Sequence, residues 1–98
     1  MVLTILEAQV EARNVPLLQE AFAQAITTLD DGIVETLLVR SIKDPSLWRI
    51  MTLWQSREAL DAMRQTGETP RGVVIFRAAG AEPVLTVFDV VAHAKAPD

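Results

Sequence analysis

Cysteine is absent from the 98-residue sequence, and histidine occurs only once, as His93. The lack of cysteine excludes disulfide bonds, thiolate metal sites and cysteine nucleophiles together. A single histidine also excludes a histidine-rich metal site, so no metal site is predicted. The sequence contains neither a glycine-rich phosphate loop nor a Ser-His-Asp arrangement, which removes two common kinds of catalytic or nucleotide site.

Long apolar runs and clusters of basic residues are also missing. The longest apolar runs are only a few residues, such as residues 73–76, whereas a membrane-spanning helix needs about 20. The N-terminal stretch MVLTILEAQVEAR has no basic lead-in and turns acidic at Glu7, so it does not resemble a signal peptide. The net charge is −4, with acidic and basic residues interleaved, which argues against a nucleic-acid surface. We therefore expect a cytoplasmic protein that binds neither membranes nor nucleic acids.

The length and the apolar content predict one folded domain over residues 1–98, with a frayed tail at 95–98. Half of the residues are hydrophobic. A chain of this size buries only ~60–65% of the surface that it exposes when unfolded, so its core is limited.

The clearest pattern is the change from strand to helix periodicity at Ser56. Residues 48–55 alternate, with Trp48 and Trp54 on the same side of a strand whose two faces are both largely apolar. Ser56 is a good helix cap, and the residues after it place Leu60 and Met63 on one helical face. This stretch therefore predicts a strand that leads directly into an amphipathic helix.

The remaining pattern predicts a β-α-β-β-α-β order. The other expected elements are a strand over 2–10, a helix capped by Asn14 and running to Leu29, a strand over 33–42 and a last strand over 84–93. Residues 43–46 form a turn, and we expect the hairpin to set Val39 opposite Met51, because a one-residue slip would oppose two arginines. Residues 73–76, in the irregular region 67–83, fit a short strand, a helical turn or a packed loop.

This order predicts an α+β, ferredoxin-like fold, with a four-stranded antiparallel sheet and two helices on one face. Right-handed crossovers place both helices on the same side and leave the other face of the sheet bare. Because the strands are apolar on both faces, we expect the bare face to pack against a second copy of the chain. The predicted partner is therefore an identical subunit, joined through the helix-free face.

Aromatic and apolar residues suggest a pocket for a small apolar or aromatic ligand between sheet and helices. Its candidate lining residues are Phe22, Trp54, Met63, Phe76 and Phe88, all of which fit an ordinary core equally well.

Polar residues near this set add candidate ligand contacts. Arg77, and also Arg71, could recognise an anionic ligand, although solvated loop arginines are commoner. The strand residues Thr4, Thr36, Thr52 and Thr86 could supply hydroxyl groups to the pocket.

Asp89 is the one candidate for a catalytic base, because aspartate is depleted in strands and this one lies among apolar residues. Its alternative role is an ion pair with Arg77 or Arg49. His93 shares its face, and histidine is the residue type that most often acts as a proton acceptor or donor at neutral pH, but it also fits a plain polar residue at a strand end. The two residues lie ~13 Å apart along a strand, so they cannot form a directly hydrogen-bonded dyad within one chain.

The sequence TLWQSREAL at residues 52–60 resembles the strand-to-helix signature of the antibiotic biosynthesis monooxygenase family. The order of elements is similar to that family over nearly the whole chain. The resemblance implies a dimeric α+β barrel whose enzymes oxidise aromatic or polyketide-like compounds with oxygen, often without metal or flavin. It therefore implies no cofactor here.

Several positions depart from the family pattern. Many members carry histidine, and the haem-degrading ones tryptophan, near the position of Met63. The haem-degrading relatives also need an asparagine on the first strand and a histidine after the second helix. Residues 7–9 are Glu, Ala and Gln, and no histidine lies between residues 56 and 91, which disfavours haem degradation.

Two functions follow from the resemblance. The first is a cofactor-independent monooxygenase, in which the substrate supplies the electrons, the protein supplies a dry cavity, and Asp89 is the candidate base. The alternative is a dimeric binding or accessory domain without catalysis.

Overall fold

The computed structural model describes residues 1–97, and within them the order of elements agrees with the β-α-β-β-α-β pattern, with one helix added. In chain order the elements are β1 (Val2–Gln9), the short 3-10 helix η1 (Ala12–Asn14), α1 (Val15–Ala25), β2 (Ile33–Arg40), β3 (Leu47–Trp54), α2 (Arg57–Gln65), α3 (Arg71–Ala78) and β4 (Val84–Asp89). Residues 90–97 form no regular element. Asp98, the end of the tail that we expected to be frayed, lies outside the described residues.

The four strands form one antiparallel sheet in the order β2-β3-β1-β4. The hairpin partner β3 fills the gap between the parallel strands β1 and β2, as the two crossovers require. This confirms the ferredoxin-like α+β fold. None of the α-helices in residues 1–97 has the length and hydropathy of a membrane-spanning segment.

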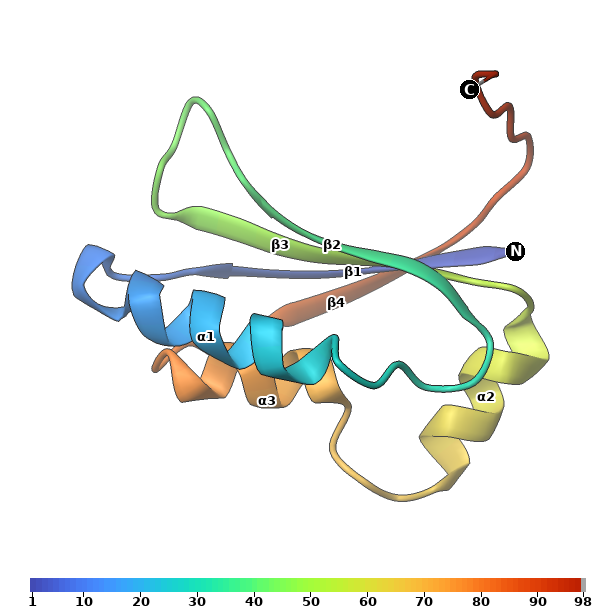
Figure 1. The fold of residues 1–98 in the computed structure, drawn as a ribbon, viewed down its shortest axis with the longest axis horizontal. Coiled ribbons are helices and arrows are strands. Elements are labelled where there is room, and N and C mark those ends of the chain that lie inside the picture. Colours follow the sequence, from blue (N-terminus) through green and yellow to red (C-terminus); the bar gives the residue numbers. More distant parts are fainter. Residues whose placement is uncertain (98) are drawn as a thin grey trace.

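The helices cover one face of the sheet (Figure 1). Helices α1 and α3 pack against each other below the sheet, whereas α2 lies near the end of β3. The undecided segment 73–76 lies in α3, so three α-helices replace the predicted two. Helix α3 buries Ile75 and Phe76, which shows that packing rather than a long periodic pattern fixes this helix.

The ends of several elements differ from the prediction. Strand β4 stops at Asp89 rather than at His93, because Asp89 pairs with Val2 and the partner strand ends there. The side chain of Asn14 makes no cap hydrogen bond, and α1 ends at Ala25 rather than Leu29. The cap predicted at Ser56 is confirmed, since its hydroxyl accepts a hydrogen bond from the backbone N–H of Ala59 at 3.1 Å.

The predicted hairpin register is wrong by two residues. Met51 lies opposite Leu37 rather than Val39, and Arg40 lies opposite Trp48. The observed register places the Arg40 guanidinium carbon 5.6 Å from the centroid of the Trp48 ring, a favourable cation–π distance. A shift of two residues leaves residues 35–40 on the same face of the sheet, because side chains alternate with a period of two. An irregularity between Ile33 and Glu35 moves Ile33 to the helix side, opposite Trp54 and away from the face of Leu37.

The core between sheet and helices is divided into two clusters. The larger surrounds Trp48, Leu18 and Phe76, and the smaller consists of Val2, Trp54 and Leu60. The two tryptophans lie on the same face of β3 and anchor opposite ends of this layer. The space between the clusters is therefore the place where a ligand site can form.

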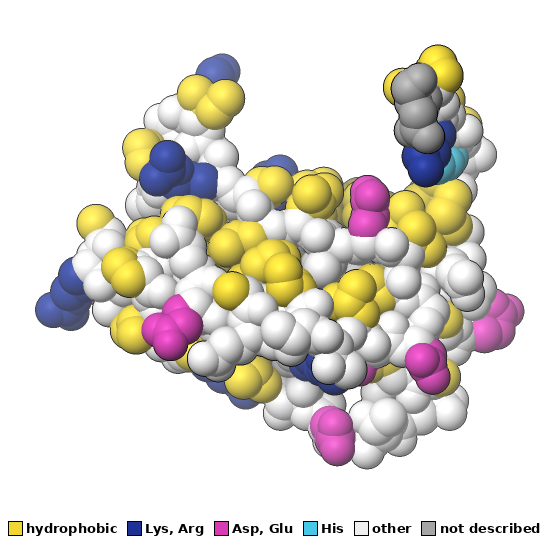
Figure 2. Space-filling model, in the orientation of Figure 1, with side chains coloured by type: hydrophobic (Ala, Val, Ile, Leu, Met, Phe, Trp, Pro, Cys, Tyr) yellow, Lys and Arg dark blue, Asp and Glu magenta, His cyan; other side chains and the backbone are white. Residues whose placement is uncertain are grey.

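The other face of the sheet carries no helix (Figure 1). Its central apolar side chains come from all four strands, and the register places Leu3, Ile5, Leu37, Met51, Leu53 and Phe88 there. The β2–β3 hairpin and the C-terminal segment project above this face at opposite ends (Figure 1). Figure 2 shows hydrophobic side chains gathered in the saddle between the two projections.

Candidate functional site

A cavity of about 160 Å³ lies between the sheet and the helices, in the gap that separates the two core clusters. Strands β1, β2 and β3 form its floor and all three α-helices contribute to its walls. Its lining is mostly apolar and includes Leu6, Phe22, Ile33, Ile50, Leu60 and Val73. The volume is close to that of the ~150 Å³ apolar cavities that admit a benzene ring. One aromatic ring therefore fits.

The floor of the cavity carries a row of three threonines. Thr4 on β1, Thr52 on β3 and Thr36 on β2 are direct neighbours across the sheet, and all three line the cavity. The Trp54 Nε1–H donates to Thr4 Oγ1 at 3.2 Å, and the hydroxyl oxygens of Thr36 and Thr52 lie 3.0 Å apart. The cavity therefore has a polar strip on a mostly apolar surface, the usual composition of a small-molecule site.

Arg71 fastens one side of the cavity mouth. Its guanidinium donates to the backbone carbonyls of Ala25, at 3.2 Å, and Thr28, and lies 3.3 Å from the carboxylate of Asp30. Ala25 is the last residue of α1 and Thr28 lies just beyond it, where carbonyl groups lack donor partners within the helix. The interaction ties the start of α3 to the end of α1, so Arg71 is committed to the protein rather than left free for a ligand.

A second, more open depression of about 470 Å³ adjoins the mouth and shares Asp30, Met63, Pro70 and Arg71 with the cavity. It lies among the α1–β2 loop, α2 and the α2–α3 loop. The cavity and this vestibule together offer room for a ligand with one enclosed ring and a larger, more exposed remainder.

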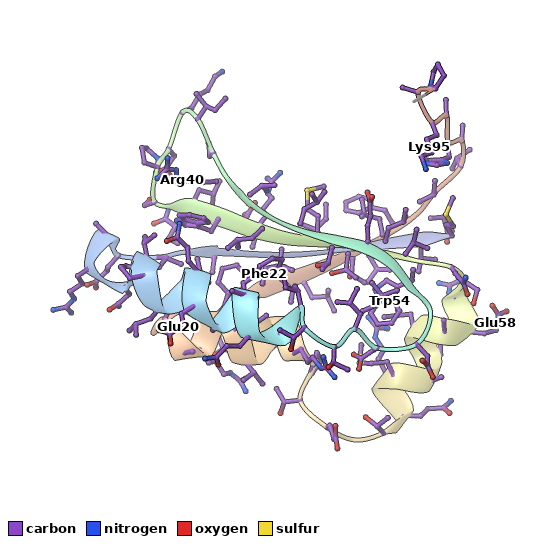
Figure 3. The ribbon with its side chains drawn as sticks, viewed as in Figure 1. Glu20, Phe22, Arg40, Trp54, Glu58 and Lys95 are labelled. Carbon is purple, nitrogen blue, oxygen red and sulfur yellow. The ribbon has the colours of Figure 1, made fainter. Side chains whose placement is uncertain are left out.

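The structure brings three of the predicted ligand residues together and leaves three outside. Phe22, Trp54 and Met63 line the cavity, and Figure 3 shows Phe22 and Trp54 between the helices and the sheet. Phe76 is completely buried in the larger core cluster. Phe88 lies on the opposite face of the sheet, paired with Leu3.

Arg77 also lies outside the cavity and makes a bidentate ion pair with Glu82, with distances of 3.0 and 2.8 Å. Hydrogen bonding from the guanidinium holds the pKa of the Glu82 carboxyl below its ordinary value. The same pair raises the pKa of Arg77. Arg77 therefore serves to connect the end of α3 to the loop before β4.

Asp89 does not form the ion pair that the sequence suggested as its alternative role. Arg77 pairs with Glu82, and Arg49 pairs with Glu7. Asp89 lies at the end of β4 on the helix side, exposed and outside the cavity lining. His93 lies beyond β4 in the exposed segment 90–97. Residues 1–97 contain no group of three or more potential metal-ligating side chains.

Sequence reasoning named the threonines only as strand residues that could reach a pocket. The structure selects three of the four, because Thr86 lies opposite Ile5 on the helix-free face. The alternation of side chains along each strand could have identified them, since Thr4 lies on the same face as Val2, and Thr52 on the same face as Trp54.

A family model described as antibiotic biosynthesis monooxygenase matches residues 1–73. The chain belongs to the antibiotic biosynthesis monooxygenase family. The matched region contains the threonine row, Trp54 and Met63, and ends inside α3. No curated protein sequence matches the chain significantly.

Several solved structures share the fold of this family member. The haem degrader MhuD of Mycobacterium tuberculosis, with two haems bound in its active site, is 26% identical, with 97% of this chain and 100% of that chain covered and a TM-score of 0.69. SnoaB, a cofactor-independent oxygenase from Streptomyces nogalater, is 14% identical, with 94% of each chain covered and a TM-score of 0.69. A conserved protein from Methanosarcina mazei is also 14% identical, with 89% of each chain covered and the same TM-score.

Proposed function

We propose that the chain is a cofactor-independent, monooxygenase-like protein that binds a small aromatic or polyketide-like compound in the cavity between sheet and helices. The supporting observation is a mostly apolar, ring-sized cavity with a polar strip on its floor, in a member of this family. Phe22, Trp54 and Met63 are the proposed ligand contacts.

The chemistry needs no redox group from the protein if the substrate is easily oxidised. A methylene activated by flanking aromatic rings or carbonyls loses a proton, and the carbanion reduces dioxygen. The overall change of CH2 plus O2 to C=O plus H2O balances, with all four electrons drawn from the substrate. The protein's contribution is to orient the ring and exclude bulk water, which prevents side reactions of the reactive intermediate.

The proposal includes a homodimer through the helix-free face. The protomer exposes 6720 Å². A monomer of 10.8 kDa averages roughly 5,500 Å², so the excess is about 1,200 Å². Part of this excess lies in the two projections above the face, where Ile42 and Val91 are 99% and 95% exposed. A comparable area on each of two subunits would lie within the range of permanent dimers.

One observation favours the alternative, a binding or accessory domain without catalysis. The ionisable residues that line the cavity are Asp30, Arg64 and Arg71, and Asp30 is paired with Arg71. Asp89, the candidate base, lies outside the lining. Proton abstraction therefore needs either a substrate that extends from the cavity to Asp89 or one that is already acidic at neutral pH.

The cavity lining does not fit a haem ligand set. Haem iron is held by histidine, cysteine or tyrosine, or by methionine together with histidine. The chain has no cysteine or tyrosine, and its only histidine, His93, does not line the cavity. Met63 alone would lack that second ligand, so no haem chemistry is proposed.

Oxygen uptake with a panel of hydroquinones and anthrones tests the catalytic proposal. We expect uptake above the buffer rate with at least one compound, and loss of that uptake in Ala25→Phe, because Ala25 lines the cavity. Ala23→Phe is the matched control, since Ala23 is exposed on the same helix. Asp89→Asn should lower uptake if Asp89 is the base.

Two outcomes would change this assignment. Uptake no faster than buffer across the whole panel, combined with quenching of tryptophan fluorescence by the same compounds, would establish the binding module instead. Equal uptake by Ala25→Phe and the unmodified protein would place the reaction outside the cavity. The proposal also keeps the cytoplasmic location expected from the sequence, which cell fractionation would check.

A further inference from the structure

The threonine row contains a hydroxyl proton that no protein group accepts. Four donors meet on the cavity floor, namely the Trp54 indole N–H and the hydroxyls of Thr4, Thr36 and Thr52. The indole donates to Thr4 Oγ1 at 3.2 Å, and the Thr4 hydroxyl donates to the Thr52 carbonyl oxygen at 3.4 Å. These two donors are therefore already committed.

The remaining two hydroxyls share a single hydrogen bond. Thr36 Oγ1 and Thr52 Oγ1 lie 3.0 Å apart, and either can be the donor. Whichever donates, the proton of the other has no acceptor within residues 1–97. Thr52 is buried and Thr36 is half-buried. A hydroxyl shielded from bulk water that leaves its hydrogen bond unmade is unfavourable, so this position favours an oxygen atom from outside the chain.

We propose that the Thr36–Thr52 pair selects ligands that carry a carbonyl or phenolic oxygen on the ring that enters the cavity. The inference rests on the proposed ligand pocket and names the substrate class that this pocket prefers. Most of the remaining lining, including Phe22, Ile50 and Leu60, is apolar. Its ionisable residues are Asp30, Arg64 and Arg71, of which Asp30 and Arg71 are paired with each other. The pair therefore fixes which edge of the ring points to the floor.

Either Thr36 or Thr52 can donate this hydrogen bond to the ligand, while the other hydroxyl donates within the pair. The expected effect of a mutation therefore depends on whether one or both hydroxyls are removed. Replacing only Thr36 or only Thr52 by valine leaves one hydroxyl whose proton is free. A single variant should therefore retain part of the preference, and only Thr36→Val/Thr52→Val should abolish it. Valine has nearly the shape of threonine and a high strand propensity, so the sheet should tolerate both changes.

The test compares acetophenone with α-methylstyrene, which has a CH2 group in place of the carbonyl oxygen. The ratio of their dissociation constants is measured in the unmodified protein and in the double variant, so that their different hydrophobicity cancels. We expect the double variant to shift this ratio against acetophenone by about 10-fold, the upper range for one neutral hydrogen bond. Thr86→Val, on the opposite face of the sheet, should leave the ratio unchanged.

A second measurement does not depend on any variant. The infrared carbonyl band of acetophenone bound to the unmodified protein should lie below its position in an alkane, as a hydrogen-bonded carbonyl requires. A band at the alkane position, or an unchanged ratio in the double variant, would overturn the inference while leaving the pocket intact, and the proton would then serve an ordered water. If neither probe binds, the proposed ligand pocket fails and this inference fails with it.

Discussion

Leu37→Lys should dissociate the proposed dimer, because Leu37 lies in the middle of the helix-free face opposite Met51. The side chain is 49% exposed in the protomer. Burying the exposed half of a leucine, roughly 80 Å², contributes about 2 kcal/mol at ~25 cal/mol per Å². Two-fold symmetry applies the change twice, so about 4 kcal/mol is lost, which weakens the dimer ~1,000-fold. The desolvation of two lysine ammonium groups adds to this loss.

Leu17→Lys is a matched control for this change. Leu17 is also 49% exposed, but it lies on α1, away from the helix-free face. Sedimentation velocity at micromolar concentration should give about twice the 10.8 kDa chain mass for the unmodified protein and for Leu17→Lys. Leu37→Lys should give the single-chain mass, with its circular dichroism spectrum unchanged.

Three results would refute the reasoning about this face. A single-chain mass for the unmodified protein would remove the dimer altogether. A dimeric Leu37→Lys would show that the subunits meet elsewhere. Equal dissociation by the two lysine variants would mean that added charge, rather than the position of the residue, controls assembly.

Two further predictions concern the stability of the fold and the shape of the cavity. Glu82→Gln should destabilise the protein at neutral pH, because the pKa of Glu82 is lowered in the folded state and the ionised carboxyl therefore stabilises the fold above the ordinary glutamate range. This contribution is lost as pH falls through the folded value, so the difference in stability between the two proteins should shrink in acid. Urea unfolding of both proteins at neutral and acid pH measures this, and a difference that stays constant would contradict it. Gly72→Ala should lower acetophenone affinity, because the new Cβ would lie 2.4 Å from Leu6 Cδ1 and displace the Leu6 side chain, which lines the cavity. The loss of stability should be small, because alanine favours a helix by about 1 kcal/mol over glycine. Thermal unfolding measures the stability and fluorescence titration the affinity, and an unchanged affinity would show that Leu6 moves away from the cavity.

Periodicity predicted the sheet and its faces because each strand packs on one side against helices. The alternation in β1 and β3 and the cap at Ser56 are local features, and the structure contains both. The sequence left helix α3 undecided among a strand, a helical turn and a loop, because residues 73–76 are a short apolar run, preceded by Gly72 and rich in β-branched residues. Its helical state depends on contacts of Ile75 and Phe76 with the rest of the core.

The hairpin register and half of the predicted pocket depended on contacts between distant residues. Avoiding two opposed arginines left more than one register open, and the pairing of Arg40 with Trp48 and of Thr36 with Thr52 distinguishes the observed one. The aromatic character of Phe88 does not by itself decide whether the side chain lies in the cavity or on the other face of the sheet. Only its place opposite Leu3 settles this.

The cavity itself is a costly feature for a domain of this size. Empty space in a core costs about 24 cal/mol per Å³, so 160 Å³ corresponds to an upper limit of about 4 kcal/mol, because the cavity opens to solvent. That is a large fraction of the 5–15 kcal/mol that stabilises a typical domain. A larger side chain at position 25 would fill this space, and valines in place of the threonines would remove its polar groups. A chain that instead keeps three hydroxyls on the floor, with one proton unpaired, has the composition expected of a binding site rather than of a packing defect.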